Sequence, residues 1–369
     1  MRQAHLRDAV ACVEYFAWLE EHLASAAANT DANANANANA HSNANANANA
    51  NANANANANA NANASASASA NATSVEEEAK EATTATASAT VSTALTIMIN
   101  EVSAAEKLAW FRSQQRDFVG LSFETISAVG PNAAVIHYTP KAESALPLTR
   151  DQIYLCDSGG QYRDGTTDVT RTLHFGQPSL HEKQCFTRVL QGVIALSRAV
   201  FPAGTVGPTL DILARSALWR AGLDYRHGTG HGVGAYLNVH EGPHGIGSTV
   251  RRPAMMETAL APGMTTSNEP GYYEDGNFGI RIENVMVVTK AQTPFRFGER
   301  DFLGFETLSL IPIQRRMIEE SMLCAEEKEW LNHFHRQCVE QVGPLLRSAR
   351  TPAADKGLQW LLQNTQHLE

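Results

Sequence analysis

The spacing of apolar residues predicts a helix at the start of the chain. Apolar positions recur near a period of 3.6 residues, with charged residues between them, at Val10, Val13 and Leu19. We therefore expect a helix from about Leu6 to Ser25. A second helix is expected through Lys107–Gln115, because Ser103 and Glu106 have the spacing of a capping box.

Apolar and β-branched runs in the middle of the chain predict strands. Three of them follow the second helix, with the sequences SFETISAVG, AAVIHY and IYLCDSG. Further strands are expected at Met264–Ser267, Ile280–Val288 and Thr307–Ile313. The Gly-rich sequence GGQYRDGT joins two strand-like runs, which indicates a hairpin.

Four more helices complete the pattern. Ser179 and Glu182 form a capping box that opens a helix to about Val200. The others are expected at Leu210–Ala221, ending at Gly222, at Ala325–Leu346 and at Gly357–Gln363. Because strands and helices do not alternate regularly, the pattern predicts an α+β fold in which helices cover one face of a curved antiparallel sheet.

A low-complexity segment separates the first two helices. Asn and Ala alternate from Asn33 to Ala64, interrupted at His41 and Ser42. Such a run buries too little apolar area to offset its ordering entropy, so we predict disorder. The expected organisation is a first helix at 1–25, a disordered insert at 26–96, and a globular domain with C-terminal helices at 97–369.

Charge and composition exclude several classes of protein. The chain has 369 residues and a formal net charge of -9, and its basic residues are scattered. These features argue against nucleic acid or a membrane surface as the main partner. The N-terminal segment does not resemble a signal peptide, and five cysteines without a CxxC spacing indicate buried free thiols. We therefore expect a cytoplasmic protein.

Five residues suggest the chemistry. They lie in the stretches YLCDSGGQY, DGTTDVTRT, HGTGHGVG, SNEPGYY and GIRIEN, and they are Asp157, Asp168, His231, Glu269 and Glu283. Four carboxylates and one imidazole can hold two divalent metals side by side and activate a water between them. Oxygen-rich coordination suits Mn, Co, Fe(II) or catalytic Zn. Asp157 and Asp168 are expected to share one face of the predicted hairpin. The pattern predicts a metallohydrolase.

The same stretches carry a resemblance to a known family. LCDSGGQYRDGTTDVTRT, LDYRHGTGHGVG, LNVHEGP and NEPGYYEDGNFGIRIEN resemble the pita-bread metallopeptidases, in particular cytosolic Xaa-Pro aminopeptidases (aminopeptidase P). The resemblance implies a pita-bread fold, two Mn(II) ions, a homodimer and peptide substrates with proline in second position. Asp157 would chelate one metal, and His231 and Glu269 would complete the other. Asp168 and Glu283 would bridge the two metals.

The resemblance also assigns histidines to the substrate pocket. His137, His227 and His240 would contact the peptide or the tetrahedral intermediate. Glu269 would shuttle a proton to the leaving nitrogen, and Arg281 would orient Glu283. A lone histidine is more often structural, so surface or packing roles are expected for His174, His181, His244, His333, His335 and His367. For Tyr273, packing is as good an interpretation as function.

A bridging hydroxide is the expected nucleophile. Three alternative functions stay open. These are a prolidase, a methionine-type aminopeptidase, and an inactive binding module of the same fold. The resemblance further implies that relatives carry two domains ahead of the catalytic one. On that comparison the chain is expected to be either a fragment or a stand-alone catalytic domain.

Overall fold

The computed structural model describes residues 1–28, 98–247 and 253–369. Two units are distinguished, one comprising Met1–Ala24 with Met98–Glu369 and the other Ser25–Ile97. The alternating Asn–Ala run lies outside the described residues, as does most of the predicted insert. The elements that follow belong to the first unit, apart from the last residues of its first helix.

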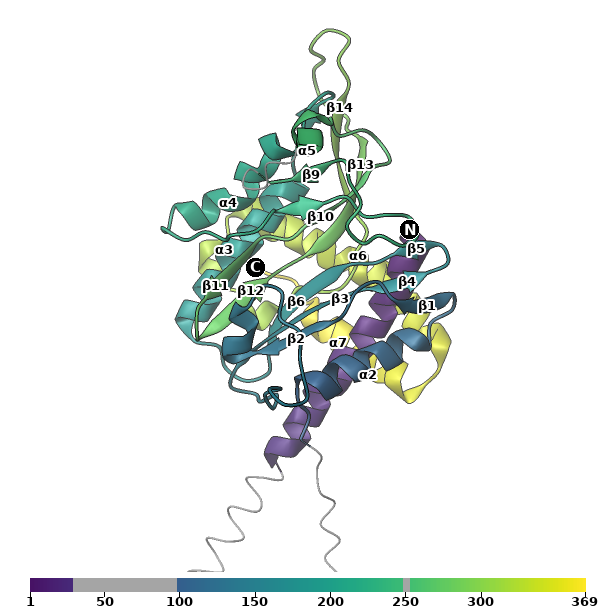
Figure 1. Cartoon of the computed structure of the whole chain (residues 1–369), viewed down its shortest axis with the longest axis vertical. Helices are drawn as coiled ribbons and strands as arrows, with labels where there is room; N and C mark the ends of the chain where they lie inside the picture. The colour runs from purple at the N-terminus through teal and green to yellow at the C-terminus, as the bar shows by residue number, and fades with distance from the viewer. Residues whose placement is uncertain (29–97, 248–252) are drawn as a thin grey trace, which may run out of the picture. The chain divides into compact units, whose positions relative to one another are not determined.

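Helices occupy both ends of this unit and part of its middle (Figure 1). The described part of the first helix covers residues 2–28. The later α-helices are α2 (Glu101–Ser113), α3 (Leu180–Ser197), α4 (Asp211–Trp219), α5 (Pro253–Glu257), α6 (Ala325–Ala349) and α7 (Pro352–Asn364). Short 3₁₀ helices are η1 (Gly130–Ala134), η2 (Gly207–Leu210), η3 (Arg315–Met317) and η4 (Glu320–Met322).

The strands form small antiparallel sheets. Those in the first half are β1 (Phe118–Leu121), β2 (Ile126–Val129), β3 (Ile153–Ser158), β4 (Gly160–Tyr162), β5 (Gly165–Thr166), β6 (Val169–His174) and β7 (Phe201–Pro202). Those in the second half are β8 (Gly230–His231), β9 (Gly245–Ile246), β10 (Thr265–Asn268), β11 (Gly271–Glu274), β12 (Phe278–Arg281), β13 (Asn284–Lys290) and β14 (Phe302–Thr307).

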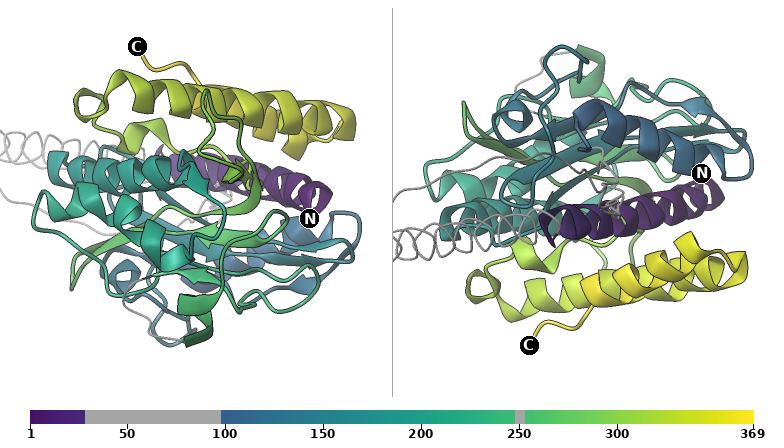
Figure 2. Two further views of the ribbon diagram at one scale, coloured as in Figure 1. Left: turned by 90° about the horizontal axis from the view of Figure 1, so that it is seen from above. Right: turned by 90° about the horizontal axis from the view of Figure 1, so that it is seen from below.

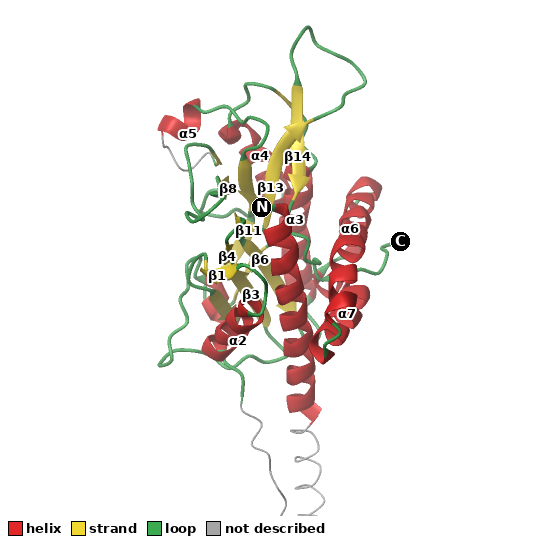
Figure 3. Ribbon diagram, turned by 90° about the vertical axis from the view of Figure 1, so that its right-hand side faces the viewer, coloured by secondary structure: helices red, strands yellow, loops and turns green. Residues whose placement is uncertain are grey.

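Two of these sheets form the frame of the unit. Their strand orders are β10-β13-β14-β7 and β2-β3-β6, and every pairing between the strands named above is antiparallel. Helices α3, α6 and α7 lie on one side of the strands (Figure 3). This arrangement confirms the predicted α+β class, with helices on one side of antiparallel sheets.

The first helix is packed into the core of this unit. Tyr15 packs against Phe111 of α2 with ring centroids 6.4 Å apart, and Phe16 packs against Trp360 of α7 at 5.7 Å. Figure 2 shows this helix beside α6 and α7. A buried ion pair between Asp8 and Arg112 also joins it to α2. Segments from both ends of the chain thus share one apolar cluster.

Helix caps were predicted with mixed success. The box at Ser179 and Glu182 is confirmed, since each side chain accepts from the other residue's backbone N–H. Helix α4 is followed, as expected, by Gly222 with a φ of 74°. The box predicted at Ser103 was wrong, because Asn100 is the cap and Ser103 is the third helical residue. An asparagine cap fits the same backbone position as serine.

Two strand predictions were also wrong. The run AAVIHY is not a strand, because Gly130, with a φ of 54°, and Pro131 start the 3₁₀ helix η1. The predicted strand Thr307–Ile313 ends at its first residue, since β14 covers Phe302–Thr307. Beyond it the Ile311 and Pro312 carbonyls accept from Arg171, and Pro312 has no N–H for a ladder.

Membrane and cysteine predictions have clear outcomes. In the described residues, helices are too short or too polar to cross a bilayer. All five cysteines are free, and four of them are buried as expected. Cys324 differs because it is exposed at the start of α6.

Candidate metal centre

The two aspartates stand on adjacent antiparallel strands. Asp157 lies in β3 opposite Thr170 of β6, and Asp168 immediately precedes β6. The predicted hairpin is confirmed, with the small β4–β5 hairpin inside its connection. Because side chains alternate along a strand, Asp168 and Thr170 share one face, and Asp157 faces them from the neighbouring strand.

His231 and Glu269 reach the same place from the second half of the chain. His231 ends β8, and its backbone N–H donates to Ser267 Oγ at 2.9 Å. The Ser267 hydroxyl donates in turn to Glu269 Oε1 at 3.0 Å. His231 Nε2 lies 3.3 Å from Glu269 Oε1 and 3.5 Å from Asp168 Oδ2. One serine thus fixes both the imidazole strand and the carboxylate.

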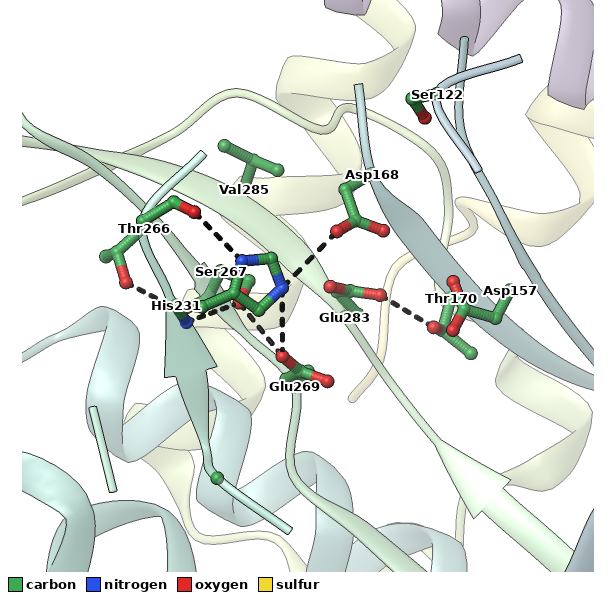
Figure 4. Close-up of polar contacts among 12 residues, drawn as sticks. Ser122, Asp157, Asp168, Thr170, His231, Thr266, Ser267, Glu269, Glu283 and Val285 are labelled. Atoms are coloured by element: carbon green, nitrogen blue, oxygen red, sulfur yellow. Dashed lines mark hydrogen bonds and ion pairs between the residues drawn. The ribbon is translucent and has the colours of Figure 1, made fainter. Parts of the chain in front are cut away.

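Glu283 completes the cluster at a break between β12 and β13. The strand predicted across Ile280–Val288 is interrupted there, so Glu283 falls between two ladders. Its N–H donates to the Thr170 carbonyl at 3.1 Å, and its Oε2 accepts from Thr170 Oγ1 at 2.7 Å. Asp168, His231 and Glu283 offer ligand atoms within 4.8 Å of one another. Figure 4 shows these residues and Glu269 pointing toward one centre.

Burial and mutual repulsion make it unfavourable for all the carboxylates at this centre to be ionised together without a cation. Burial, and then the neighbouring carboxylates Glu283 and Asp157, raise the pKa of Asp168 well above its ordinary value. Burial, followed by Glu269 and Asp157, does the same to the pKa of Glu283. Burial raises the pKa of Glu269 to about 8. The cluster therefore favours a bound cation over free carboxylates.

The donor set fits divalent metals. Burial lowers the pKa of His231 to about 4, so the ring is neutral near pH 7. Its Nδ1 lies 3.0 Å from the Gly232 carbonyl and carries the hydrogen, so the Nε2 lone pair faces the two carboxylates. Asp157 Oδ1 is buried without a hydrogen-bond partner among the described residues. A bound divalent cation would compensate lone pairs that face one another in a buried site.

Arg281 supports the centre differently from the prediction. Arg281 was expected to orient Glu283, and the direct partner of its guanidinium is Asp157, whose Oδ2 accepts at 2.7 Å. The guanidinium also donates to Thr170 Oγ1 at 3.2 Å, and Thr170 donates to Glu283. Arg281 therefore orients Asp157 directly and reaches Glu283 only through Thr170, whose role the sequence did not reveal.

Tyr273 has a polar role that the sequence left open. Its hydroxyl accepts from Arg281 Nη1 at 2.7 Å and lies 2.9 Å from His227 Nε2. His227 Nδ1 lies 2.8 Å from the Gly228 carbonyl and carries the hydrogen, so Nε2 accepts from the tyrosine. Burial, followed by Arg281, lowers the pKa of His227 to about 3. Tyr273 thus joins His227 to Arg281.

All the predicted site residues line one cavity of about 550 Å³. Its walls include the five candidate ligands and Arg281, and the three candidate histidines are His137, His227 and His240. The rings of His240 and His231 meet edge-on with centroids 4.1 Å apart. His244, for which a surface or packing role was predicted, also lines the cavity, and its Nε2 lies 2.8 Å from the Thr265 carbonyl.

Family models match most of the chain. The model of metallopeptidase family M24 matches residues 71–290, and that of the C-terminal region of peptidase M24 matches residues 301–368. The chain belongs to metallopeptidase family M24. This membership agrees with the resemblance drawn from the sequence motifs.

Individual M24 relatives are similar over much of the chain. A probable Xaa-Pro aminopeptidase P of Metarhizium acridum is 55% identical over 273 residues, which cover 74% of this chain and 43% of the relative. That of Fusarium vanettenii is 44% identical over 369 residues, covering 100% of this chain and 47% of the relative.

A solved M24 structure is similar over the whole chain. It is the X-prolyl aminopeptidase of Caenorhabditis elegans, described as a cytosolic enzyme with a di-nuclear active site. The TM-score is 0.75 at 35% identity, and the match covers 100% of this chain and 47% of that one. The chain thus spans less than half the length of these relatives.

Proposed function

We propose that the chain is the catalytic domain of an Xaa-Pro aminopeptidase, which releases the first residue from peptides with proline in second position. The observation that carries this proposal is the convergence of four carboxylates and His231 in one cavity with His137, His227 and His240. The names of the M24 relatives support the same substrate class and favour it over the prolidase, methionine-type and inactive alternatives.

Two divalent cations, Mn(II) in our proposal, would be held by the five clustered residues. Asp157 would bind one cation and His231 with Glu269 the other, while Asp168 and Glu283 would bridge them. When bound, such a pair supplies an activated water and polarises the scissile carbonyl. The carboxylate-rich donor set suits Mn(II), Co, Fe(II) or Zn better than copper.

The protein's own groups would handle the proton and the developing charge. Glu269, whose Oε1 lies 3.3 Å from His231 Nε2, is placed to take a proton and pass it to the leaving proline nitrogen. His240, beside His231, is placed to hydrogen-bond the tetrahedral intermediate. His227 lines the same cavity, where Tyr273 holds its Nε2 at 2.9 Å, and it would contact the peptide there.

An Xaa-Pro bond sets particular demands on such a cavity. Proline has no N–H, so the site cannot recognise the scissile bond through a donor and must accept a ring instead. The apolar side chains Phe123, Ile126 and Ile136 form part of the cavity wall near His137 and supply such a surface. We further propose that the protein is cytoplasmic and forms a homodimer. Light scattering of the purified protein would test the dimer.

A peptide assay tests the proposal against its alternatives. With Mn(II) added, we expect release of arginine from Arg-Pro-Pro and loss of that activity with a chelator. Cleavage restricted to the dipeptide Arg-Pro would indicate a prolidase, and cleavage restricted to Met-Ala peptides would indicate a methionine-type enzyme. Absence of hydrolysis of any of these peptides would contradict the proposal.

A further inference from the structure

The loop that carries His137 has little regular structure of its own. It joins β2 to β3 through η1, and residues 135–145 contain neither helix nor strand. Most of these residues are exposed, including His137 itself, although His137 lines the cavity. Hydrogen bonds such as Tyr138 N–H to Val135 O and Ala145 N–H to Lys141 O join loop residues to one another. The position of His137 therefore depends on how the loop is attached to the frame.

A buried carboxylate attaches this loop at several points. Glu101, in the first turn of α2, has an exposed fraction of 0%. Its Oε1 accepts from the Val129 N–H at 2.8 Å, where the loop begins, and its Oε2 accepts from the Leu146 N–H at 2.9 Å, where the loop ends. One side chain thus holds both ends of the loop.

Glu101 also holds the middle of the loop. Its Oε2 accepts from the Tyr138 hydroxyl at 2.7 Å, and both oxygens accept from Asn132 Nδ2 at 3.0–3.1 Å. Tyr138 directly follows His137 in the chain. The Tyr138 ring packs against an apolar cluster that includes Ile126 and Ala133, so its hydroxyl is aimed at the carboxylate by packing.

Other contacts fix the ends of the loop without reaching its middle. Gly279 of β12 lies so close to η1 that a Cβ there would come within 1.7 Å of the Ala133 carbonyl oxygen. At the far end, the Leu148 N–H donates to the Ile99 carbonyl at 2.9 Å. Neither contact includes the residues beside His137, which Glu101 holds through Tyr138.

We propose that Glu101 is a positioning residue for catalysis, which sets the place of His137 in the cavity by holding the loop of residues 129–146 against α2. This inference rests on the proposed function, because it assigns to His137 a contact with the peptide. Glu101 itself does not line the cavity and does not touch substrate.

The variant Glu101→Gln tests the proposal sharply. Both carboxylate oxygens accept from a backbone N–H, whereas a glutamine amide has one acceptor oxygen, so either amide orientation leaves an NH₂ group against one N–H. We expect kcat/KM for Arg-Pro-Pro to fall about tenfold, which corresponds to about 1.4 kcal/mol. The milder variant Tyr138→Phe keeps the ring packing and should lower it by about threefold.

A double-mutant cycle with His137→Ala separates positioning from general destabilisation. If Glu101 acts through His137, Glu101→Gln will change kcat/KM by less than about twofold in the His137→Ala background. The matched control is Asp8→Asn, which removes another buried carboxylate that binds α2, through Arg112. Asp8→Asn should change kcat/KM by the same factor in the wild-type and His137→Ala backgrounds. An equal factor for Glu101→Gln in the two backgrounds would overturn the proposal.

Hydrogen exchange provides a readout that does not depend on activity. We expect Glu101→Gln to speed amide exchange in a peptide spanning residues 129–146, while a peptide from β13 remains as in the wild type. Unchanged exchange in the loop would overturn the proposal, whatever the kinetics. If the wild type hydrolysed no peptide, the proposed function would fail, and with it the catalytic part of the inference. Faster exchange in the variant would then still show that Glu101 holds the loop.

Discussion

Removing the Tyr273 hydroxyl is predicted to weaken both the fold and the activity. The hydroxyl accepts from Arg281 Nη1 at 2.7 Å and donates to His227 Nε2, 2.9 Å away. Tyr273→Phe deletes this oxygen and keeps the ring. Arg281 retains Asp157 at 2.7 Å, so the buried guanidinium is not left without an anion.

The hydrogen bonds set the expected magnitude. A hydrogen bond to a charged group contributes about 1.5–3 kcal/mol, and one between neutral groups about 1 kcal/mol. Because Arg281 keeps its other partners, we expect the free energy of unfolding to fall by about 2–3 kcal/mol. If a similar loss fell on the transition state, kcat/KM would decrease by between about 30-fold and 140-fold, since about 1.4 kcal/mol corresponds to tenfold.

Urea unfolding and peptide kinetics would measure these two effects. The matched control is Tyr272→Phe, since Tyr272 is the neighbouring residue in β11 and its hydroxyl donates instead to Glu274 at 3.2 Å. We expect the control to stay within about 0.5 kcal/mol and twofold of the wild type, as surface changes usually do. If Tyr273→Phe behaved like the control in both assays, the reasoning about this network would be refuted.

Three other changes test separate parts of the structure. Asp168→Asn should lower kcat/KM by more than about a hundredfold, because loss of a residue that only supports a metal ligand already costs up to about a hundredfold. Circular dichroism should show an intact fold, because the change removes one of several carboxylates that repel one another in a buried site. Gly279→Ala should destabilise the protein in thermal melts, since its Cβ would overlap the Ala133 carbonyl. Burial lowers the pKa of His335 to about 3, so the folded state keeps this ring neutral and its contribution to stability is lost as pH falls from 6.5 toward 3. The wild type should therefore lose up to about 1.4 kcal/mol more per pH unit than His335→Gln between pH 6.5 and 4.5 in urea titrations, and equal slopes would contradict this.

Local signals in the sequence predicted much of the fold. The capping box at Ser179 and the glycine after α4 depend on neighbours within a few residues, and both are confirmed. The run AAVIHY failed because its conformation depends on Gly130 and on the distant carboxylate Glu101. A single sequence does not show such a long-range contact.

The residues that converge on the candidate site could be predicted from the sequence, but the side chains that support them could not. Carboxylates in Gly-rich stretches stand out individually, and the structure brings Asp168, His231 and Glu283 together. The partner of Arg281 was predicted from sequence proximity to Glu283. The register of β11 and β12 pairs Gly271 with Arg281, and Arg281 donates to Asp157 instead. The polar role of Tyr273 follows from that same hairpin geometry.

Five residues from five separate segments are proposed to bind a pair of metals. Elemental analysis of the purified protein, loaded with Mn(II) and then desalted, tests this claim most directly. We predict about two metals per chain in the wild type and a clear reduction in Asp168→Asn, because that change removes a bridging carboxylate. Wild-type protein that retained no metal after loading would contradict the central claim.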